Sequence, residues 1–481
     1  MIPTPELDFL PILPLLILAG GALIALVAVP FARRGAQTPF VVLTLVVLAA
    51  AAGSALWLWD RDPALVMGGM ATMDHLALVG TIALCGAGAF GAFLGFHYFQ
   101  QDEQRCNEFY ALLLFALTGM ALLVFAADLI IVFLAVETLS LALYVMTALT
   151  FRRGPTEASM KYFLLGAFAA AFLLYGIAMA YGAAATTSIL GLANALSGST
   201  GSQPIAFVAV VLLVIGLGFK VSLVPFHMWT PDVYQGAPSP VTAFMSAATK
   251  IAVFVALVRI LDVAFIGLRW DVTPLLVALS MVSMVVGSIL AIAQTDAKRM
   301  LAYSSIAQAG FILASFAASD ADAIGSTLFY LVTYGLAVIG AFGVVMLVSG
   351  GVREATGFDR FKGLARRQPV LAGLLTLFLL SLAGIPPTAG FAAKVLVFSA
   401  ATSAGWWPLV LVGALAAVAG AFFYLRLVAI MAMREPEGED VVDSSPMPRL
   451  VLAIPAFAVV VLGIIPGLIL PILREAGVLR W

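Results

Sequence analysis

The chain has 481 residues, of which 63% are hydrophobic and only 10% are charged. Because an average soluble domain carries about 25% charged residues, this composition excludes a soluble globular protein and indicates one that crosses a membrane many times. The formal net charge of −1 implies no nucleic-acid partner. The two cysteines, Cys85 and Cys106, and the three scattered histidines have no metal- or haem-binding spacing, so we expect no redox centre on this chain.

Apolar segments of the length of a membrane-spanning helix, roughly 20 residues, follow one another along the whole chain. The first segment comes after Glu6 and Asp8 rather than after basic residues, which favours a retained helix over a signal peptide. We therefore predict an all-α polytopic membrane protein with about 14 transmembrane helices. In chain order the predicted spans are 9–31, 38–59, 74–98, 108–126, 128–151, 158–182, 204–226, 239–262, 272–294, 299–318, 322–350, 368–402, 406–433 and 449–472.

Basic residues gather in alternate connections between these spans, and this asymmetry sets the predicted orientation. The basic connections are predicted to face the cytoplasm or an organelle matrix, which places both termini on the opposite side. The other connections, such as the long neutral loop after residue 185, carry few basic residues. The basic set consists of Arg33, Arg34, Arg105, Arg152, Arg153, Lys298, Arg299, Arg353, Arg360, Lys362, Arg366, Arg367, Arg434 and Arg449.

Two of the predicted spans contain prolines that should interrupt the helix, because proline removes a backbone donor and clashes with the preceding turn. In the seventh span Lys220 stands five residues before Pro225, and in the twelfth Pro386 and Pro387 precede Lys394. Irregular backbone at membrane depth survives only where it is buried in protein or lines a wet cavity. The two breaks therefore predict functional sites inside the membrane.

Broken spans at matching positions in two halves of a chain are typical of inverted repeats built around an ion pathway. Spans 4–8 and 9–13 form two groups of five, and an odd number of spans inverts the second copy. We therefore predict two inverted five-helix repeats, each with one broken helix, at residues 105–265 and 266–433. A three-helix segment (1–104) precedes them, and a loop with the last helix (434–481) follows.

Four of the six lysines lie inside long apolar runs, namely Lys161, Lys220, Lys250 and Lys394. A charge at the bilayer centre is costly, so such residues are rare and usually functional. A buried lysine can lose its proton, whereas arginine stays charged. We therefore predict that these lysines bind and release protons, although Lys161, near the start of its span, could instead reach the interface.

Glu137 is the only carboxylate well inside a predicted span. A buried acid stays charged when a cation lies beside it, so we expect Glu137 to pair with Lys161, with Lys220 or with both. Asp128, near a span end, is predicted to be a helix cap or a surface group.

Other polar side chains are weaker candidates. His227, in the first break, is either a proton relay or a structural hydrogen-bond donor. Tyr303, Ser304 and Ser305 could hydrate a channel, but such residues also pack helices routinely. We expect Asp232 to be a loop cap or a subunit contact. Near span ends, Arg259 with Asp262, and separately Arg426, are interpreted as interface anchors.

Two segments carry a resemblance to a known family. PFHMWTPDVYQGAPSPVTAFMSAATK (225–250) and TDAKRMLAYSSIAQAGF (295–311) resemble the signature of the antiporter-like membrane subunits of respiratory complex I and of multi-subunit cation/proton antiporters. The similarity covers about residues 105–430. Within this family the chain is most similar to the subunit N branch of NADH-quinone oxidoreductase. The sibling subunit M is expected to carry glutamate at position 394, and the sibling L to continue past residue 481 into a lateral helix.

The resemblance implies roles for the candidate residues. It assigns Glu137 and Lys220 to a first-half glutamate–lysine pair, with Lys161 as an additional lysine. Lys250 becomes the connecting central residue and Lys394 the second-half lysine. A proton would enter from the cytoplasm, be held near Lys220, pass Lys250 and leave through Lys394, driven by quinone reduction elsewhere in the complex.

The resemblance also implies partners and a location. FMN, iron–sulfur clusters and quinone are expected on other subunits, with no cofactor on this chain. The expected neighbours are the sibling subunit M, the small subunits K and J, and membrane lipids, in a bacterial inner membrane with both termini on the periplasmic side. Two alternatives remain at this point: a subunit of a stand-alone sodium/proton antiporter, and a scaffold whose lysines bind only lipids or neighbouring subunits.

Overall fold

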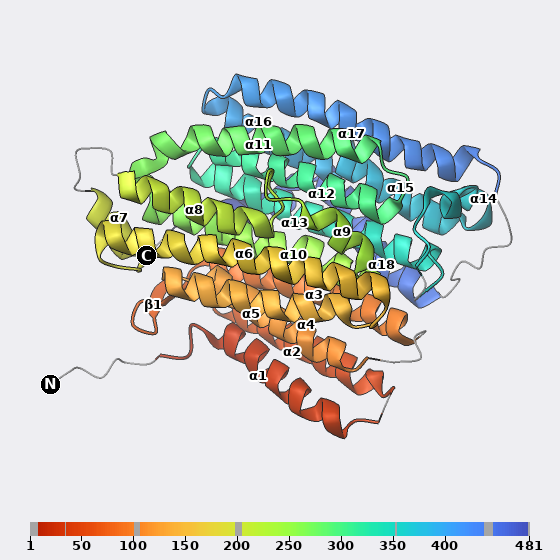
Figure 1. Cartoon of the computed structure of the whole chain (residues 1–481), viewed down its shortest axis with the longest axis horizontal. Coiled ribbons are helices and arrows are strands. Elements are labelled where there is room, and N and C mark those ends of the chain that lie inside the picture. The colour runs from red at the N-terminus through yellow and green to blue at the C-terminus, as the bar shows by residue number, and fades with distance from the viewer. Residues whose placement is uncertain are drawn as a thin grey trace.

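Long apolar helices that run side by side make up most of the structure, a computed structural model that describes residues 8–33, 35–100, 106–197, 204–351, 354–436 and 446–479 (Figure 1). Within these ranges twelve helices are long and apolar enough to cross a membrane, and three shorter apolar helices accompany them. The prediction of an all-α polytopic membrane protein is confirmed. The count of 14 spans and the inverted repeats stay predictions, and Arg34, Arg105 and Arg353 lie outside the described residues.

The N-terminal part consists of helices on one flank of the molecule. Helices α1 (Leu13–Ala28), with the short 3-10 turn Val29–Phe31, α2 (Gln37–Trp57) and α3 (His75–Gln100) pack against one another or against α4. A two-stranded antiparallel hairpin, β1 (Ala64–Val66) and β2 (Ala71–Met73), joins α2 to α3. Helix α3 also contacts α10, so this part is continuous with the rest of the bundle.

The next group of helices contains the first break. It runs through α4 (Glu108–Phe125), α5 (Leu129–Ala148), α6 (Arg153–Ala184), α7 (Ile189–Ser197), α8 (Pro204–Lys220), α9 (Trp229–Gly236) and α10 (Ser239–Arg259), which continues as a π-helix over Ile260–Ala264 and a 3-10 turn over Ile266–Leu268. Asp128 caps α5, since its carboxylate accepts a hydrogen bond from the Ile130 N–H at 2.8 Å, as predicted. The predicted seventh span is interrupted between Lys220 and Trp229.

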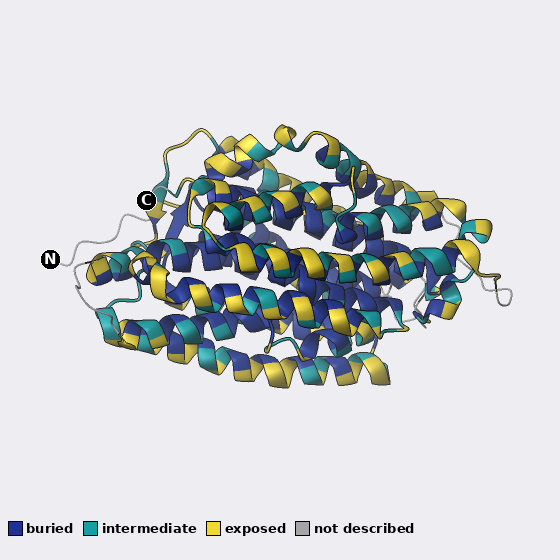
Figure 2. Ribbon diagram, turned by 90° about the horizontal axis from the view of Figure 1, so that it is seen from above, coloured by how far each residue is buried: buried dark blue, intermediate teal, exposed yellow. Residues whose placement is uncertain are grey.

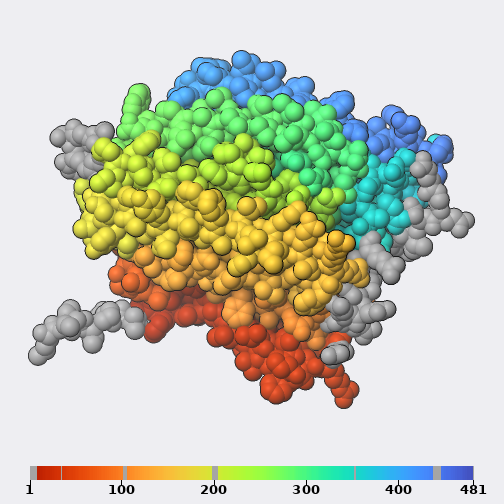
Figure 3. Space-filling model, viewed as in Figure 1, coloured from red at the N-terminus to blue at the C-terminus, as the bar shows by residue number. Residues whose placement is uncertain are grey.

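The last group contains the second break. Its helices are α11 (Arg269–Ile292), α12 (Ala297–Leu313) with the 3-10 turn Ala314–Ala317, α13 (Ala321–Val348), the 3-10 turn Phe358–Phe361, α14 (Leu364–Arg367), α15 (Pro369–Ala383), α16 (Ala389–Ser403), α17 (Trp407–Met433), α18 (Pro446–Ile464), the 3-10 turn Pro466–Leu468 and α19 (Leu470–Ala476). The twelfth predicted span is therefore two helices, α15 and α16, separated at Gly384–Thr388. On the face in Figure 3 the N-terminal residues lie along one flank and residues near 420, within α17, along the opposite flank, with the intervening yellow and green segments between them.

Helix α10 lies at the centre of the molecule, and every one of its residues is buried. It packs against α3, α4 and α13, while the outer helices alternate between buried and exposed residues (Figure 2). The outward faces of α6 and α17 carry large apolar side chains such as Phe168 and Val418. Such surfaces suit a hydrocarbon environment, and the buried centre is where polar groups need partners.

Candidate functional site

Lys220 is the last residue of α8, and only 3% of it is exposed. The helix ends here because the chain turns away before Pro225, which could not continue the backbone hydrogen bonds. The Lys220 ammonium donates a hydrogen bond to the Tyr144 hydroxyl at 3.2 Å. It also lies 5.0 Å from the ring centre of Tyr144 and 5.2 Å from that of Tyr162, within the range of cation–π attraction.

The short helix α9 closes this aromatic cage. The Trp229 indole stacks on the Tyr162 ring with centroids 4.4 Å apart, and its N–H donates to the Phe219 carbonyl at 2.8 Å. The bond to the Phe219 carbonyl satisfies one acceptor near the end of α8 that has no partner within the helix. The Lys220 ammonium thus lies among the rings of Tyr144 on α5, Tyr162 on α6 and Phe219 on α8, and Trp229 of α9 packs against the last two.

Lys250 lies in the middle of α10 and is 1% exposed. Its ammonium donates to the Ser305 hydroxyl of α12 at 2.6 Å, and the Tyr334 hydroxyl of α13 donates to the same oxygen at 2.9 Å. The Tyr334 ring centre lies 5.6 Å from the Lys250 nitrogen. Neutral hydroxyls and a ring, rather than a carboxylate, therefore surround this lysine.

Gln308, one turn after Ser305 on α12, is the centre of a second polar group. Its amide oxygen accepts from the Tyr330 hydroxyl at 2.5 Å, and its amide nitrogen donates to the Leu382 carbonyl at 2.8 Å and to the Tyr424 hydroxyl at 3.3 Å. Tyr424 is in turn hydrogen-bonded to Ser304. A cavity of about 10 Å³ beside Tyr330 and Gln308 has room for the centre of roughly one water molecule.

Lys394, in the second turn of α16, is 6% exposed and lies against the second break. Its ammonium donates to the carbonyls of Ala383 at 2.7 Å and Leu382 at 3.2 Å. These carbonyls end α15, where a helix carries partial negative charge. The Leu382 carbonyl also accepts from Gln308, so Lys394 is connected to the polar group on α12.

Lys250 and Lys394 are thus joined by an almost continuous row of polar side chains. Ser305 and Gln308 lie on one face of α12, and Tyr330 and Tyr334 lie four residues apart on α13, a spacing that also places them on one face. Within the described part of the chain, hydrogen bonds connect each step of this row except the single helical turn between Ser305 and Gln308. Among the described residues, Lys220, Lys250 and Lys394 have no carboxylate within 4 Å.

Glu137 on α5 is half-buried; among the described residues it forms no ion pair within 4 Å with Lys161 or Lys220, but it is near enough to Lys220 to interact with it electrostatically. Lys161 instead forms ion pairs with Glu157 at 3.0 Å and with Asp232 at 2.8 Å. Glu157 is one turn away on the same helix, and α9 brings Asp232 against α6. Lys161 is therefore held by acids at the end of its helix rather than by an acid in the middle of α5.

This arrangement can be compared with known proteins. Residues 126–420 match the family described as NADH:quinone oxidoreductase/Mrp antiporter, TM. NADH-quinone oxidoreductase subunit N of Salinispora arenicola is 41% identical over 98% of both chains. The subunit N of Acidothermus cellulolyticus is 48% identical over 78% of this chain and 73% of its own length.

A solved structure agrees with these relatives. A chain of respiratory complex I from Thermus thermophilus with bound aureothin is 35% identical, with a TM-score of 0.84, and the match covers 96% of this chain and 100% of that one. The chain belongs to the NADH-quinone oxidoreductase subunit N family. The Mrp complex from Dietzia sp. matches at a TM-score of 0.85 and 21% identity, which shows the shared fold alone.

In this subunit N chain the possible relay residues have different surroundings. Ser304 and Ser305 both take part in the buried hydrogen bonds around Tyr424 and Lys250. Tyr303 is outside that row and lies beside Arg299, whose guanidinium carbon is 6.0 Å from the tyrosine ring centre. His227 is half-buried in the first break, and among the described residues its Nδ1 has no hydrogen-bond partner.

Asp232 lies in the first turn of α9 and forms ion pairs within the chain rather than a loop cap, while the expected subunit contact stays a prediction. Its two carboxylate oxygens accept from Lys161 and from Arg299, each at 2.8 Å. It thereby links α6, α9 and α12. The sequence offered one signal, since Asp232 and Arg299 both lie within the family-like segments 225–250 and 295–311.

Sequence reasoning missed two buried ion pairs at the ends of α10. At its start, Lys298 donates to Glu354 and to the Ala237 carbonyl, each at 2.5 Å, and Glu354 accepts from the Ser239 N–H at 2.7 Å. At its end, Arg259 forms two bonds of 2.7 Å with Asp74.

The interpretation of Arg259, together with Asp262, as an interface anchor is therefore wrong for Arg259. Arg259 is completely buried and turned toward Asp74, which lies just before α3. Asp262 instead pairs with Arg269 at 3.2 Å. Asp74 directly precedes a long apolar segment, and from this position a buried acid could have been predicted.

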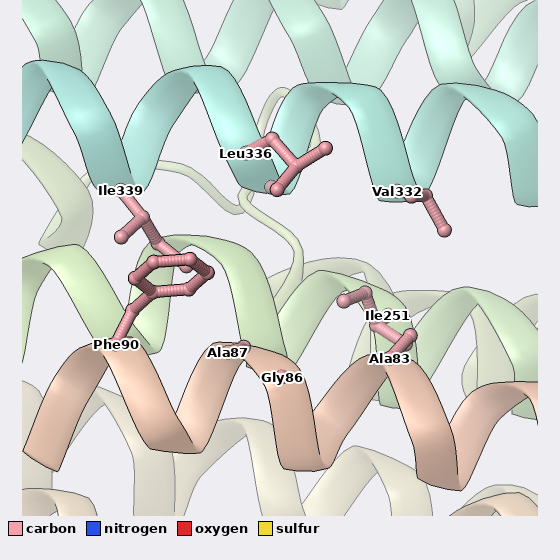
Figure 4. Close-up of a pocket in the computed structure, with 9 residues that line it drawn as sticks. Ala83, Gly86, Ala87, Phe90, Ile251, Val332, Leu336 and Ile339 are labelled. Carbon is pink, nitrogen blue, oxygen red and sulfur yellow. The ribbon is translucent and has the colours of Figure 1, made fainter. Parts of the chain in front are cut away.

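Three cavities adjoin these groups. Two polar clefts of about 320 and 300 Å³ meet at Gly154, Gln235 and Gly236; the first is lined by Glu354 and the second by Lys161 and Asp232. A third, of about 160 Å³, lies between α3, α10 and α13 and is lined by apolar side chains such as Phe90, Leu336 and Ile339 (Figure 4). The polar clefts lead toward the ion pairs, whereas the apolar one offers no group for proton transfer.

Proposed function

We propose that proton translocation by this subunit of NADH-quinone oxidoreductase runs through Lys220, Lys250 and Lys394. The observation that carries this proposal is that each lysine is at least 94% buried and surrounded by hydroxyls, rings or carbonyls rather than a carboxylate. An ammonium in such a site is destabilised by desolvation, so it can release its proton. The polar row from Lys250 to Lys394 supplies intermediate positions.

The energy required is within reach of such sites. Moving one charge against ~150 mV costs roughly 3.5 kcal/mol, and each unit of pKa change at a lysine is worth about 1.36 kcal/mol. A change of about three units would therefore suffice. Because the lysines interact, they titrate as a coupled set.

The driving signal enters through charged groups near Lys220. Quinone reduction in the rest of the complex would change the charge or position of a neighbouring subunit, and Glu137, with Lys161 and its acidic partners, would respond. Lys161 is 44% exposed in its side chain and has two carboxylate partners, so it can exchange between them at small cost. When Lys161 moves from one carboxylate to the other, the electrostatic field at Lys220 changes.

The remaining components follow from membership of the family. FMN, iron–sulfur clusters and quinone would reside on other subunits, so this chain would contribute to the translocase without a redox centre. Its neighbours would be the antiporter-like subunit M and the small subunits K and J, together with membrane lipids. The complex would lie in a bacterial inner membrane, with both termini of this chain on the periplasmic side.

The alternative, a subunit of a stand-alone cation/proton antiporter, shares the fold. Relatives at 40% to 48% identity carry the name NADH-quinone oxidoreductase subunit N, and this favours the respiratory complex. A scaffold role would predict normal pumping after replacement of the lysines.

The test uses inverted membrane vesicles that carry the whole complex with Lys220→Ala. NADH:quinone turnover and proton uptake are measured together, after native gels have established normal assembly. We expect both rates to fall about tenfold or more, because an obligatory proton site is missing. Lys362→Ala, which removes a lysine paired with Asp359 in the loop after α13, is the matched control and should leave both rates unchanged.

If turnover and the ratio of protons to electrons are both unchanged in Lys220→Ala, the lysine is structural and the proposed path through this chain is wrong.

A further inference from the structure

The hydroxyl of Tyr144 on α5 contacts the lysine of the first break. Tyr144 is on α5, seven residues after Glu137, so both project from nearly the same face of that helix. Ser140, between them on this face, donates a hydrogen bond to the Val136 carbonyl of the same helix. The Tyr144 hydroxyl accepts the hydrogen bond from Lys220, at 3.2 Å. Tyr144 is thus the contact between α5 and the lysine.

A glycine on the neighbouring helix makes room for this hydroxyl. A methyl group added at Gly166 of α6 would stand 1.9 Å from the Tyr144 oxygen and 2.7 Å from the carbon that bears it. Such distances are far inside van der Waals contact, so even alanine at this position would displace the phenol. The place of the hydroxyl is therefore set by the backbone of α6.

The other tyrosine of the cage provides a contrast. Tyr162 presents its ring to Lys220 at 5.2 Å, almost the same distance as the ring of Tyr144. Its hydroxyl is buried, and among the described residues it has no hydrogen-bond partner. The two rings give similar cation–π attraction, but only one hydroxyl contacts the ammonium.

We propose that Tyr144 is a positioning residue that holds the Lys220 nitrogen against the face of α5 that carries Glu137. Proton binding at Lys220 then responds to the charge of Glu137. This inference rests on the proposed proton path.

The chemistry of a phenol suits this task. A tyrosine hydroxyl can accept a hydrogen bond from a charged lysine and donate one to a neutral lysine. It therefore keeps the nitrogen in place in both protonation states, whereas a carboxylate in direct contact would favour only the charged state. Glu137 is not in direct contact with the nitrogen. Its charge can therefore shift the equilibrium between charged and neutral Lys220 without holding the lysine in the charged state.

The titratable groups around Lys220 limit which side chain could make its proton binding depend on pH. The titratable side chains around it are Tyr144 and Glu137 on α5 and Tyr162 on α6. Of the other helices packed against α8, α11 contributes the uncharged Ser283, which accepts from the Val224 N–H, and the titratable group of α10 is Lys250, which is hydrogen-bonded to Ser305 of α12. Glu137 is the acid through which a pH-dependent effect on Lys220 would act.

The experiment compares Tyr144→Phe with Tyr162→Phe in the whole complex, in inverted vesicles, across a range of pH. Each substitution removes one buried oxygen and keeps the ring. For Tyr144→Phe we expect coupled turnover to fall about tenfold, the loss typical of a hydrogen bond to a charged group, with a shift of the pH profile. Tyr162→Phe should lose far less, because its hydroxyl does not contact the ammonium, and Tyr175→Phe, on an exposed face of α6, should match the unchanged protein. Gly166→Ala should reproduce the Tyr144→Phe profile and add little to it in the double variant.

A second comparison separates positioning from mere packing. Glu137→Gln should shift the pH profile of turnover in the native background and shift it much less when combined with Tyr144→Phe. An equal shift in both backgrounds, or identical behaviour of Tyr144→Phe and Tyr162→Phe, would overturn the role of Tyr144.

The two proposals fail separately. If Lys220→Ala stops pumping while Tyr144→Phe behaves like Tyr162→Phe, the path stands and the positioning role falls. If Lys220→Ala pumps normally, the proposed path fails, and the role of Tyr144 fails with it.

Discussion

The two ends of α10 differ from its middle in how they hold buried charge. At the ends, Lys298 pairs with Glu354 and Arg259 with Asp74. In the middle, Lys250 is equally buried, and among the described residues its ammonium has the Ser305 hydroxyl as its hydrogen-bond partner and the Tyr334 ring as its cation–π partner. The three cations lie on or against one helix and are equally buried. They differ in the groups that they contact, not in the depth of their burial.

The difference separates structural from titratable charge. A buried pair with satisfied hydrogen bonds stays charged, and removing one partner leaves an expensive unpaired ion. An unpaired buried lysine is already destabilised as a cation and can become neutral. We infer that the ends of α10 fix the helix and that its middle exchanges protons. The predictions below run from the largest expected effect on stability to the smallest.

Arg259→Ala should be the most destabilising of these changes. It leaves the Asp74 carboxylate, which is 4% exposed, without its bidentate partner. Breaking such a pair costs about 3–5 kcal/mol, so we expect little assembled complex on native gels and a strongly lowered thermal midpoint. Replacing both residues by leucine should recover much of the loss. Normal assembly of Arg259→Ala would show that this end of α10 needs no ion pair.

Glu354→Gln should cost less, about 2 kcal/mol, because the amide can still accept from the Ser239 N–H while Lys298 loses its counter-charge. The measurement is the thermal midpoint of the purified complex. Glu157→Gln is the matched control, since its pair with Lys161 is exposed on both sides and worth only about 0.3–0.5 kcal/mol. Equal shifts for the two variants would contradict the distinction between buried and exposed pairs.

Gly384→Ala tests the second break. Gly384 has φ +80°, and an added methyl would stand 2.7 Å from the Cδ of Lys394. The left-handed backbone costs about 1–2 kcal/mol for alanine, and the contact should also move the ammonium away from its carbonyls. We expect a modest loss of stability and a clear loss of proton uptake. Gly373→Ala, in open space on α15, should change neither; a similar loss there would point to general weakening of the helix.

Lys250→Met should change stability least, because it replaces an unpaired buried charge by an apolar side chain of similar length. The same variant should nevertheless lose most proton uptake, measured in inverted vesicles against NADH:quinone turnover. If it failed to assemble, as Arg259→Ala is expected to, the middle of α10 would be structural and the contrast within this helix would disappear.

Much of the architecture could be predicted from local sequence. Apolar segment length located the twelve helices confirmed as membrane-spanning in length and composition, and prolines located both breaks, after Lys220 and before Lys394. These predictions succeed because the thickness of the hydrocarbon core and the missing proline N–H act on each segment independently of its neighbours. The family signature in 225–250 and 295–311 is likewise local.

The partners of the charged groups could not be predicted in the same way. Arg259 meets Asp74 across 185 positions of the chain, and Lys161 meets Asp232 rather than Glu137. Such meetings depend on how each helix is rotated about its axis and which helix it packs against, and apolar segments with little periodicity do not specify that rotation.

The sequence by itself therefore determined that this chain spans a membrane, belongs with antiporter-like subunits and carries four lysines within its apolar runs. Only the tertiary structure decided which charges are paired, since the packing of α3, α12 and the loop after α13 around α10 brings acids to its ends and hydroxyls to its middle. The physical reason is that burial is set by segment composition, whereas the free energy of a buried charge is set by the few atoms within hydrogen-bonding distance.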